Sequence, residues 1–294
     1  MQYRLWRVVT AVARRLPPRA AYAIAVILGS IGFYCWPRGR NATLRNFRRV
    51  LPDAPPAELR RIARRSLVNY CRYLADFVRF PAISPQAFIE MARGTESFAT
   101  LDAALTRGKG AIIVCMHFGN WDMGAGAAAA RGYPVTVVAE TFVDPRLNEM
   151  VVGARQRLGM QVLKTEKPGP SLIRALKQNG LLALLIDRPT PGDGIKVRFF
   201  GEEVEVPAGP ARLALRTGAA VVPAAFPRIR PDRPEVNTLT DFSIDLPPTG
   251  EETEDIRALT QAIMQAHERF IRAYPDQWYM FREMWPRARN LVTG

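Results

Sequence analysis

The sequence has few of the residues that build disulfide scaffolds and metal centres. Its 294 residues include only 3 Cys, without a Cys-x-x-Cys pair, and only 2 His. These counts argue against a disulfide framework, a zinc ribbon and His-rich metal sites. We therefore expect no metal site, and no cofactor is expected either. With 48% hydrophobic and 23% charged residues, the chain also has too much core material to be disordered.

Acidic residues are scarce in the first third of the chain. The formal net charge is +14, and residues 1–100 hold 17 Arg but only 5 acidic residues. Such a basic front end suits nucleic acid or an anionic membrane surface. The Arg residues alternate with long apolar runs, and no recognised nucleic-acid motif is present. We therefore expect a membrane surface and no nucleic acid, and keep a basic nucleic-acid-binding protein as an alternative.

The uncharged run Ala20–Trp36 lies between Arg-rich flanks. As a helix it would reach roughly 25 Å, at the short limit for crossing a bilayer. Tyr34 and Trp36 are typical anchors at the membrane interface. The pattern favours an interfacial helical hairpin over a span, so residues 1–50 are predicted to be membrane-associating helices. The alternative is a buried core helix beside a solvated basic one.

From residue 109 onward, strand patterns alternate with helix patterns. Such alternation predicts an α/β fold, with a central, mostly parallel sheet wrapped by helices, as a single domain over residues 51–294. A helix with one Arg-rich face precedes this region after Pro55, and a final helix follows from Ile256 to Phe270. Residues 228–255 are Pro-rich and polar, which predicts an exposed excursion with one edge strand near Phe242–Leu246. The predicted strands are Ala111–Met116, Val135–Ala139, Leu181–Ile186 and Val221–Phe226; the helices between them are Trp121–Arg131, Pro145–Leu158, Ser171–Gln178 and Ala208–Thr217.

His117 directly follows the first of these strands, at the sheet edge where ligands bind in such folds. Asp122 comes five residues later, so the two can form a general base and the carboxylate that orients it. Gly119 permits close approach of the backbone, and N–H groups near Asn120 are placed to line an oxyanion site. The alternative is a strand-end His that caps the following helix.

No protein nucleophile accompanies this His-Asp pair. The chain has no Gly-x-Ser-x-Gly turn, and Cys115 belongs to the apolar strand itself. A substrate hydroxyl is then the natural nucleophile, which makes the predicted reaction an acyl transfer. A lipid hydrolase that activates water with the same pair is the enzymatic alternative.

The run from His117 to Asp122 resembles the His-x4-Asp/Glu block of the lysophospholipid acyltransferase superfamily, and its lipid A late acyltransferase branch in particular. Further blocks fall in that family's order: Val138–Glu140, Arg157–Met160, Leu185–Arg188, Val197–Gly201, Pro207–Ala211 and Pro275–Trp278. The resemblance implies a peripheral enzyme on the cytoplasmic face of the bacterial inner membrane. It also implies an acyl thioester donor, either acyl-CoA or acyl-carrier protein.

The same resemblance indicates which lipids could accept the acyl group. Lipid A enzymes often carry Asp-x-Asp at the block matching Asp187, whereas this chain reads Asp187-Arg188-Pro189. Other blocks look more like the phosphatidylinositol mannoside acyltransferases. Both relatives acylate a sugar hydroxyl, so a glycolipid of one of these two types is expected as acceptor.

His117 and Asp122 are thus the predicted catalytic residues. Predicted substrate-binding residues are Asn120, Glu140, Arg157, Asp187, Arg188 and Glu202. Each has a plainer alternative: a turn-capping acid at Asp187, an ion-paired Arg188, a solvated helix face around Arg157, and a hairpin-turn carboxylate at Glu202. His267 falls on the apolar stripe of the last helix and is expected to be a core residue.

Overall fold

The computed structural model describes residues 10–94, 96–139, 144–164, 169–190, 192, 194–240, 244, 246 and 249–285. Its centre is a six-stranded sheet in the order β10-β8-β2-β5-β3-β4, in which only the edge strand β10 runs antiparallel. The mixed α/β fold with a mostly parallel sheet is thereby confirmed. The strands are β2 (Ala111–Cys115), β3 (Val135–Ala139), β4 (Gln161–Lys164), β5 (Leu181–Leu185), β8 (Ala220–Ala225) and β10 (Leu239–Thr240).

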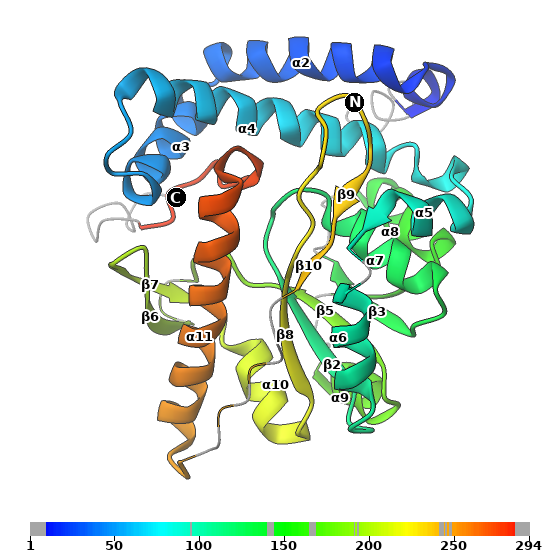
Figure 1. Ribbon diagram of the computed structural model, residues 1–294, viewed down its shortest axis with the longest axis vertical. Helices are drawn as coiled ribbons and strands as arrows, with labels where there is room; N and C mark the ends of the chain where they lie inside the picture. Colours follow the sequence, from blue (N-terminus) through cyan, green and yellow to red (C-terminus); the bar gives the residue numbers. More distant parts are fainter. Residues whose placement is uncertain are drawn as a thin grey trace.

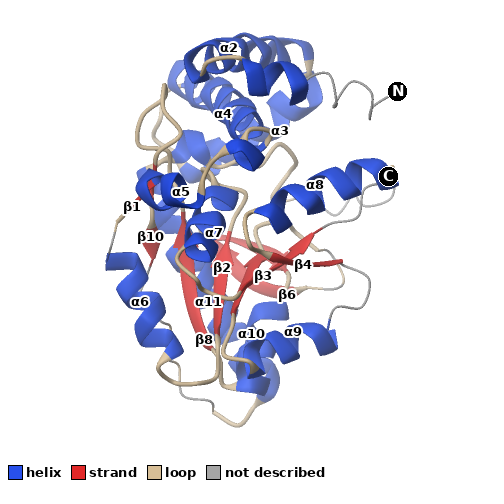
Figure 2. Cartoon of the chain, turned by 90° about the vertical axis from the view of Figure 1, so that its right-hand side faces the viewer, coloured by secondary structure: helices blue, strands red, loops and turns tan. Residues whose placement is uncertain are grey.

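Side chains of β2 alternate between two hydrophobic cores, one on each face of the sheet. Ile112 and Val114 belong to the first core, while Ile113 and Cys115 belong to the second. Both faces are therefore covered, as a parallel sheet requires. The first core includes α9 (Gly169–Lys177), α10 (Gly209–Thr217) and α11 (Glu252–Ala273); the second includes α5 (Pro85–Met91), α6 (Glu96–Leu105), α7 (Trp121–Ala130) and α8 (Pro145–Arg157). Figure 2 shows the sheet between these helices.

Three N-terminal helices form a layer at one end of the sheet: α2 (Pro18–Cys35), α3 (Pro37–Val50) and α4 (Pro56–Phe77). Figure 1 shows α2 lying along α4, outermost in the molecule. Ala21, Ala25 and Gly29 recur every four residues on the buried face of α2. A Cβ on Gly29 would stand 2.6 Å from the Cα of Val68, so this helix pair needs glycine for its close approach.

The predicted division after residue 50 falls between α3 and α4. In the structure α4 packs with α2 and α3, so these three helices form one layer. The assignment of residues 1–50 as a separate segment stays a prediction.

The structure also describes part of the predicted edge strand and several short elements that were not predicted from the sequence. The predicted edge strand Phe242–Leu246 falls mostly outside the described residues, although Ile244 forms an antiparallel bridge to Val221 of β8, the strand that β10 also pairs with. Strands of two residues are too short to leave a periodic pattern. The remaining elements are the hairpin β6 (Ile195–Phe199) and β7 (Glu202–Val206), the pair β1 (Ala92–Arg93) and β9 (Val236–Asn237), and the 3₁₀ turns Phe80–Ala82 and Pro275–Gln277.

Candidate active site

The strand register brings His117 and Asp187 together. β2 and β5 are parallel neighbours with Cys115 opposite Leu185, so the residues two positions beyond each strand also face one another. The Nδ1 atom of His117 lies 2.8 Å from Oδ1 of Asp187. Both residues sit at the carboxyl end of the strands, where ligands bind in sheets of this type.

The Asp187 carboxylate is completely buried and accepts two further hydrogen bonds at Oδ2. The donors are the backbone N–H of His117 and the indole N–H of Trp278, each at 3.1 Å. Burial by itself would raise the pKa of Asp187, but the charge and hydrogen bonds of His117 hold it below its usual value. A carboxylate beside Nδ1 favours the imidazole tautomer with its proton on Nδ1, and in that tautomer Nε2 has the free lone pair. The His117 side chain is 15% exposed and so remains accessible.

The turn after His117 is fixed by backbone hydrogen bonds. Gly119 has φ +58°, and a Cβ there would stand 2.0 Å from the carbonyl oxygen of Phe226, so only glycine fits. Gly119 donates to the Gln277 carbonyl at 2.9 Å, and Asn120 donates to the Phe226 carbonyl at 2.8 Å. The predicted oxyanion role for N–H groups near Asn120 is therefore wrong for these two groups, because each already has an acceptor.

Asn120 does not point towards a substrate. Its side chain is completely buried; Oδ1 accepts from the backbone N–H of Met123, and Nδ2 donates to Asp76. Asn120 is the N-cap of α7 and holds the turn between His117 and that helix, and its predicted role in substrate binding stays a prediction.

The structure does not place the Asp122 carboxylate against His117, and its predicted orienting role stays a prediction. It lies in the first turn of α7, and its carboxylate is held by Arg155 of α8 through two hydrogen bonds of 2.7 and 3.1 Å. The Tyr73 hydroxyl of α4 donates a third bond at 2.7 Å. Both carboxylate oxygens are thus committed to a buried ion pair, and the carboxylate that contacts His117 is that of Asp187.

An apolar cavity lies between α7 and the sheet, next to this ion pair. Small residues of α7 leave the space, since Gly124, Ala125 and Ala128 all line it. Trp121, Asp122 and Arg155 form its polar end, and strand residues such as Ile113, Cys115, Val137 and Leu185 line its wall. Phe98 and Leu101 of α6 also contribute. The cavity suits a hydrocarbon chain better than a polar ligand.

Comparison with known proteins identifies the family of the chain. The family model described as bacterial lipid A biosynthesis acyltransferase matches residues 2–287. The chain belongs to this family. It is 31% identical over 247 residues to a phosphatidylinositol mannoside acyltransferase of Mycobacterium tuberculosis, covering 82% of this chain and 75% of the relative. A protein of the same name from Mycolicibacterium smegmatis is 32% identical over 260 residues, covering 82% and 78%. The protein is therefore an acyltransferase.

Three of the other predicted site residues of this acyltransferase lie in the described part of the chain, and their surroundings differ. Arg188 follows Asp187, and its charge reaches Tyr70 of α4, where it lowers the pKa that burial raises. Arg157 is exposed at the end of α8. Glu202 lies in the β6–β7 hairpin, 3.5 Å from Arg49 of α3, as an exposed ion pair. Glu140 lies outside the described residues. The substrate-binding roles of these four residues stay predictions.

Three side chains that hydrogen-bond to Asp122 or Asp187 were not predicted from the sequence: Tyr73, Arg155 and Trp278. Arg155 belongs to a polar helix that gives no sign of a buried carboxylate partner, and Tyr73 and Trp278 look like ordinary core aromatics. Only the family block Pro275–Trp278 pointed to this last segment. Among the described residues, no group of three or more His, Cys, Asp or Glu side chains is placed to hold a metal ion.

Proposed function

We propose that this acyltransferase moves a fatty acyl group from a thioester donor to a hydroxyl of a glycolipid, with His117 as the general base. The observation that carries the proposal is the 2.8 Å contact between His117 Nδ1 and Asp187 Oδ1, which leaves Nε2 as the ring nitrogen to accept a proton, on a side chain that is 15% exposed. Nε2 takes the hydroxyl proton as the acceptor oxygen attacks the thioester carbonyl. The carbon–sulfur bond then breaks, and the imidazolium returns the proton to the leaving thiolate. General-base help of this kind is worth about 10²–10⁴ in rate.

The apolar cavity supports the acyl part of this proposal. Its polar end includes Trp121, whose ring is 5.4 Å from that of His117. An acyl chain that enters from the His117 side can pass between α7 and the sheet, which keeps the thioester carbon near the base. Acyl-CoA and acyl-carrier protein both fit this arrangement, because they differ only beyond the sulfur.

The acceptor is inferred from chemistry and relationship together. Two relatives named as phosphatidylinositol mannoside acyltransferases cover most of this chain, and the family name refers to lipid A. Both names describe glycolipids with free sugar hydroxyls and anionic groups. Arg188, one residue beyond the catalytic carboxylate, is suited to an anionic group of such a lipid.

A membrane position on the cytoplasmic face, where thioester donors are made, is part of the same proposal. By length and composition, α2 is the one described helix apolar enough to cross a membrane. Its Ala21–Gly29 face packs on α4, while Ile24, Ile27, Leu28 and Ile31 form an opposite face that is 43–58% exposed at each residue. A helix held flat in this way suits the interface better than a span.

Positive charge adjoins the exposed face of α2. A cavity between α2, α3 and α4 is lined by Arg40, Arg60, Arg61 and Arg64, together with Tyr34. Each basic residue near an anionic surface contributes on the order of 1 kcal/mol to binding. Vesicle sedimentation tests this: Ile27→Glu should reduce binding at all salt concentrations, whereas Arg60→Gln should reduce it only at low salt. Full binding of Ile27→Glu would place the attachment elsewhere.

The decisive test of function is a transfer assay with defined donors. The full chain is incubated with radiolabelled palmitoyl-CoA or palmitoyl-carrier protein, and with vesicles that contain either a phosphatidylinositol mannoside or a lipid A precursor. Acylated glycolipid is expected from the wild type and none from His117→Ala. Free fatty acid without acylated glycolipid would instead identify a hydrolase.

A further inference from the structure

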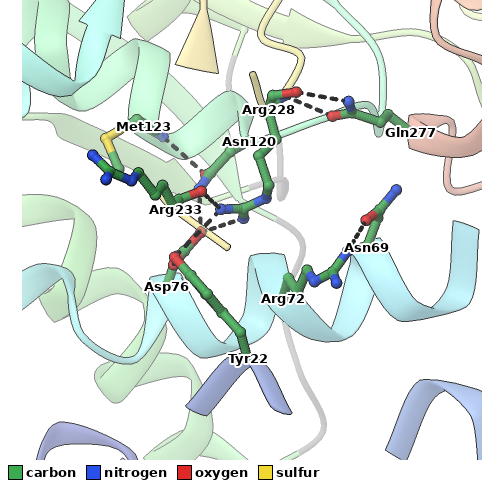
Figure 3. A network of polar contacts seen from close by, with 9 residues as sticks. All are labelled: Tyr22, Asn69, Arg72, Asp76, Asn120, Met123, Arg228, Arg233 and Gln277. Carbon is green, nitrogen blue, oxygen red and sulfur yellow. Dashed lines mark hydrogen bonds and ion pairs between the residues drawn. The ribbon is translucent and has the colours of Figure 1, made fainter. Parts of the chain in front are cut away.

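A second buried polar cluster lies outside the catalytic pair. Tyr22, Asp76, Asn120 and Arg228 are each less than 8% exposed, and they come from α2, α4, the catalytic turn and the segment after β8. Figure 3 shows their side chains converging on the Asp76 carboxylate. None of them touches the apolar cavity or contacts His117 directly, so the acyl-transfer mechanism does not use them.

Asp76 is the centre of this cluster. Its Oδ1 accepts from the Tyr22 hydroxyl at 2.5 Å, and its Oδ2 accepts from Asn120 Nδ2 at 3.1 Å and from the Arg228 guanidinium. Burial would lower the pKa of Arg228, but Asp76 raises it, so the guanidinium stays charged. Burial and Asp76 both raise the pKa of Tyr22, which keeps its hydroxyl protonated as a donor.

Two routes connect Asp76 to the catalytic turn. The first is direct, through Asn120, which caps α7 three residues after His117. The second passes through Arg228, whose backbone N–H and C=O are both bonded to the Gln277 side chain, at 2.7 and 3.0 Å. The backbone carbonyl of Gln277 in turn accepts a hydrogen bond from the Gly119 N–H. Both routes end within three residues of His117, at Asn120 and at Gly119.

The cluster is more polar than packing alone requires. A buried ion pair with its hydrogen-bond partners contributes little net stability compared with apolar residues of the same shape. What it supplies is geometry, because each member fixes the position of the next. Here the fixed object is the turn that carries the catalytic base.

Resting on the function proposed above, we propose that Asp76 is a positioning residue for the catalytic turn, and that Tyr22 completes it, so that His117 is correctly placed only while α2 is seated on α4. The outermost helix of the molecule thereby contributes to catalysis without touching substrate. Displacing a reacting group by about 1 Å can cost roughly 10²-fold in rate, so small movements of the turn matter.

The test uses the two histidines of the chain as probes. Full-length protein in detergent, with isotope-labelled His, gives two sets of ring signals by NMR, which His117→Ala assigns. His117 reports the catalytic turn. His267 is completely buried on α11, 3.2 Å from the Val114 carbonyl, and reports the integrity of the core.

Two variants perturb the cluster, and one serves as a matched control. Tyr22→Phe removes one hydroxyl, and Asp76→Asn removes the central charge. Tyr133→Phe removes a tyrosine hydroxyl that bonds an aspartate, Asp102, at the same 2.5 Å, but next to the amino-terminal end of β3. It should leave both His117 and the rate unchanged.

We expect the His117 signal to shift in both cluster variants while the His267 signal stays in place. kcat should fall about 10- to 100-fold in Asp76→Asn and less in Tyr22→Phe, with KM changed no more than about twofold. If Asp76→Asn does not fold, Tyr22→Phe decides. An unchanged His117 signal and kcat in a folded Tyr22→Phe protein would overturn the proposal. The NMR result does not depend on acyl transfer, so it distinguishes this failure from a failure of the proposed function.

Discussion

The two carboxylates at the ends of the segment from His117 to Asp122 have different partners. At the first end, Asp187 faces an imidazole, which can lose or gain a proton. At the second, Asp122 faces the Arg155 guanidinium and the Tyr73 hydroxyl, neither of which gives up its proton at neutral pH. The first arrangement can perform chemistry, whereas the second can only hold a fixed charge and a fixed shape. A buried acid near a catalytic residue is therefore not by itself a catalytic acid or orienter.

Substitutions in the His117–Asp187 pair should have the largest effect on activity. We expect His117→Ala to lower kcat about 10²–10⁴-fold, and Asp187→Asn to approach this loss, because the amide no longer holds the correct imidazole tautomer. Single-turnover rates with one thioester donor measure both. Asp187→Asn with more than a tenth of wild-type activity would show that His117 is oriented by another group.

Disrupting the Asp122–Arg155 ion pair should lower the stability of the fold more than the catalytic rate. Asp122→Asn leaves the largely buried Arg155 without its counter-charge, so we expect a loss of about 3–5 kcal/mol in the free energy of unfolding. Its loss in kcat should be smaller than that of Asp187→Asn. Urea unfolding provides the measurement.

The matched control for this ion pair is exposed. The Arg146–Asp144 pair at the start of α8 includes an Arg146 side chain that is 61% exposed, so Arg146→Gln should leave the free energy of unfolding nearly unchanged. If Asp122→Asn were as mild as this control, the Asp122–Arg155 pair would not be a structural element.

The last prediction concerns the second histidine, and its effect appears only on acidification. Burial lowers the pKa of His267 to about 4, and its Nδ1 has no hydrogen-bond partner among the described residues. An unfolded His binds its proton below about pH 6.5. Between pH 6.5 and 4 the unfolded state thus holds more protons, so stability falls as pH falls through this range.

The comparison variant is His267→Gln, which keeps a donor for the Val114 carbonyl but does not titrate. We expect the free energy of unfolding of the wild type to drop between pH 6.5 and 4 by on the order of 3 kcal/mol more than that of the variant. Equal pH slopes in urea titrations would contradict a buried, neutral His267.

The sheet and the position of His117 could be predicted from the sequence because they depend on local patterns. Continuous apolar runs mark four of the six strands, and a polar residue directly after such a run lies at the ligand-binding edge. The partner of His117 could not be predicted in the same way. β5 pairs with β2 although β3 and β4 come between them in the chain, and only that pairing sets Asp187 beside His117.

Asp122 shows that proximity in the sequence does not ensure contact in the structure. It is near His117 in sequence, but the tight turn at Gly119 and the start of α7 direct its carboxylate to Arg155. Asp76 and Arg228 gave no signal at all, because an acid in an Arg-rich helix and an Arg in a Pro-rich excursion both look solvated. Their pairing depends on the packing of α4 against the sheet layer, which has no local pattern.

The segment around Trp278 has a consequence for how the enzyme is made. Trp278 donates to Asp187, Tyr279 donates its N–H to the His117 carbonyl, and Ser66 of α4 donates to the Trp278 carbonyl. During translation, the catalytic pair and the N-terminal helices leave the ribosome long before residues 278 and 279. With the membrane attachment through α2 proposed above, a nascent chain would reach the membrane while His117 still lacks these contacts. Acylating activity should arise only after this late segment has been synthesised and has closed over the sheet edge.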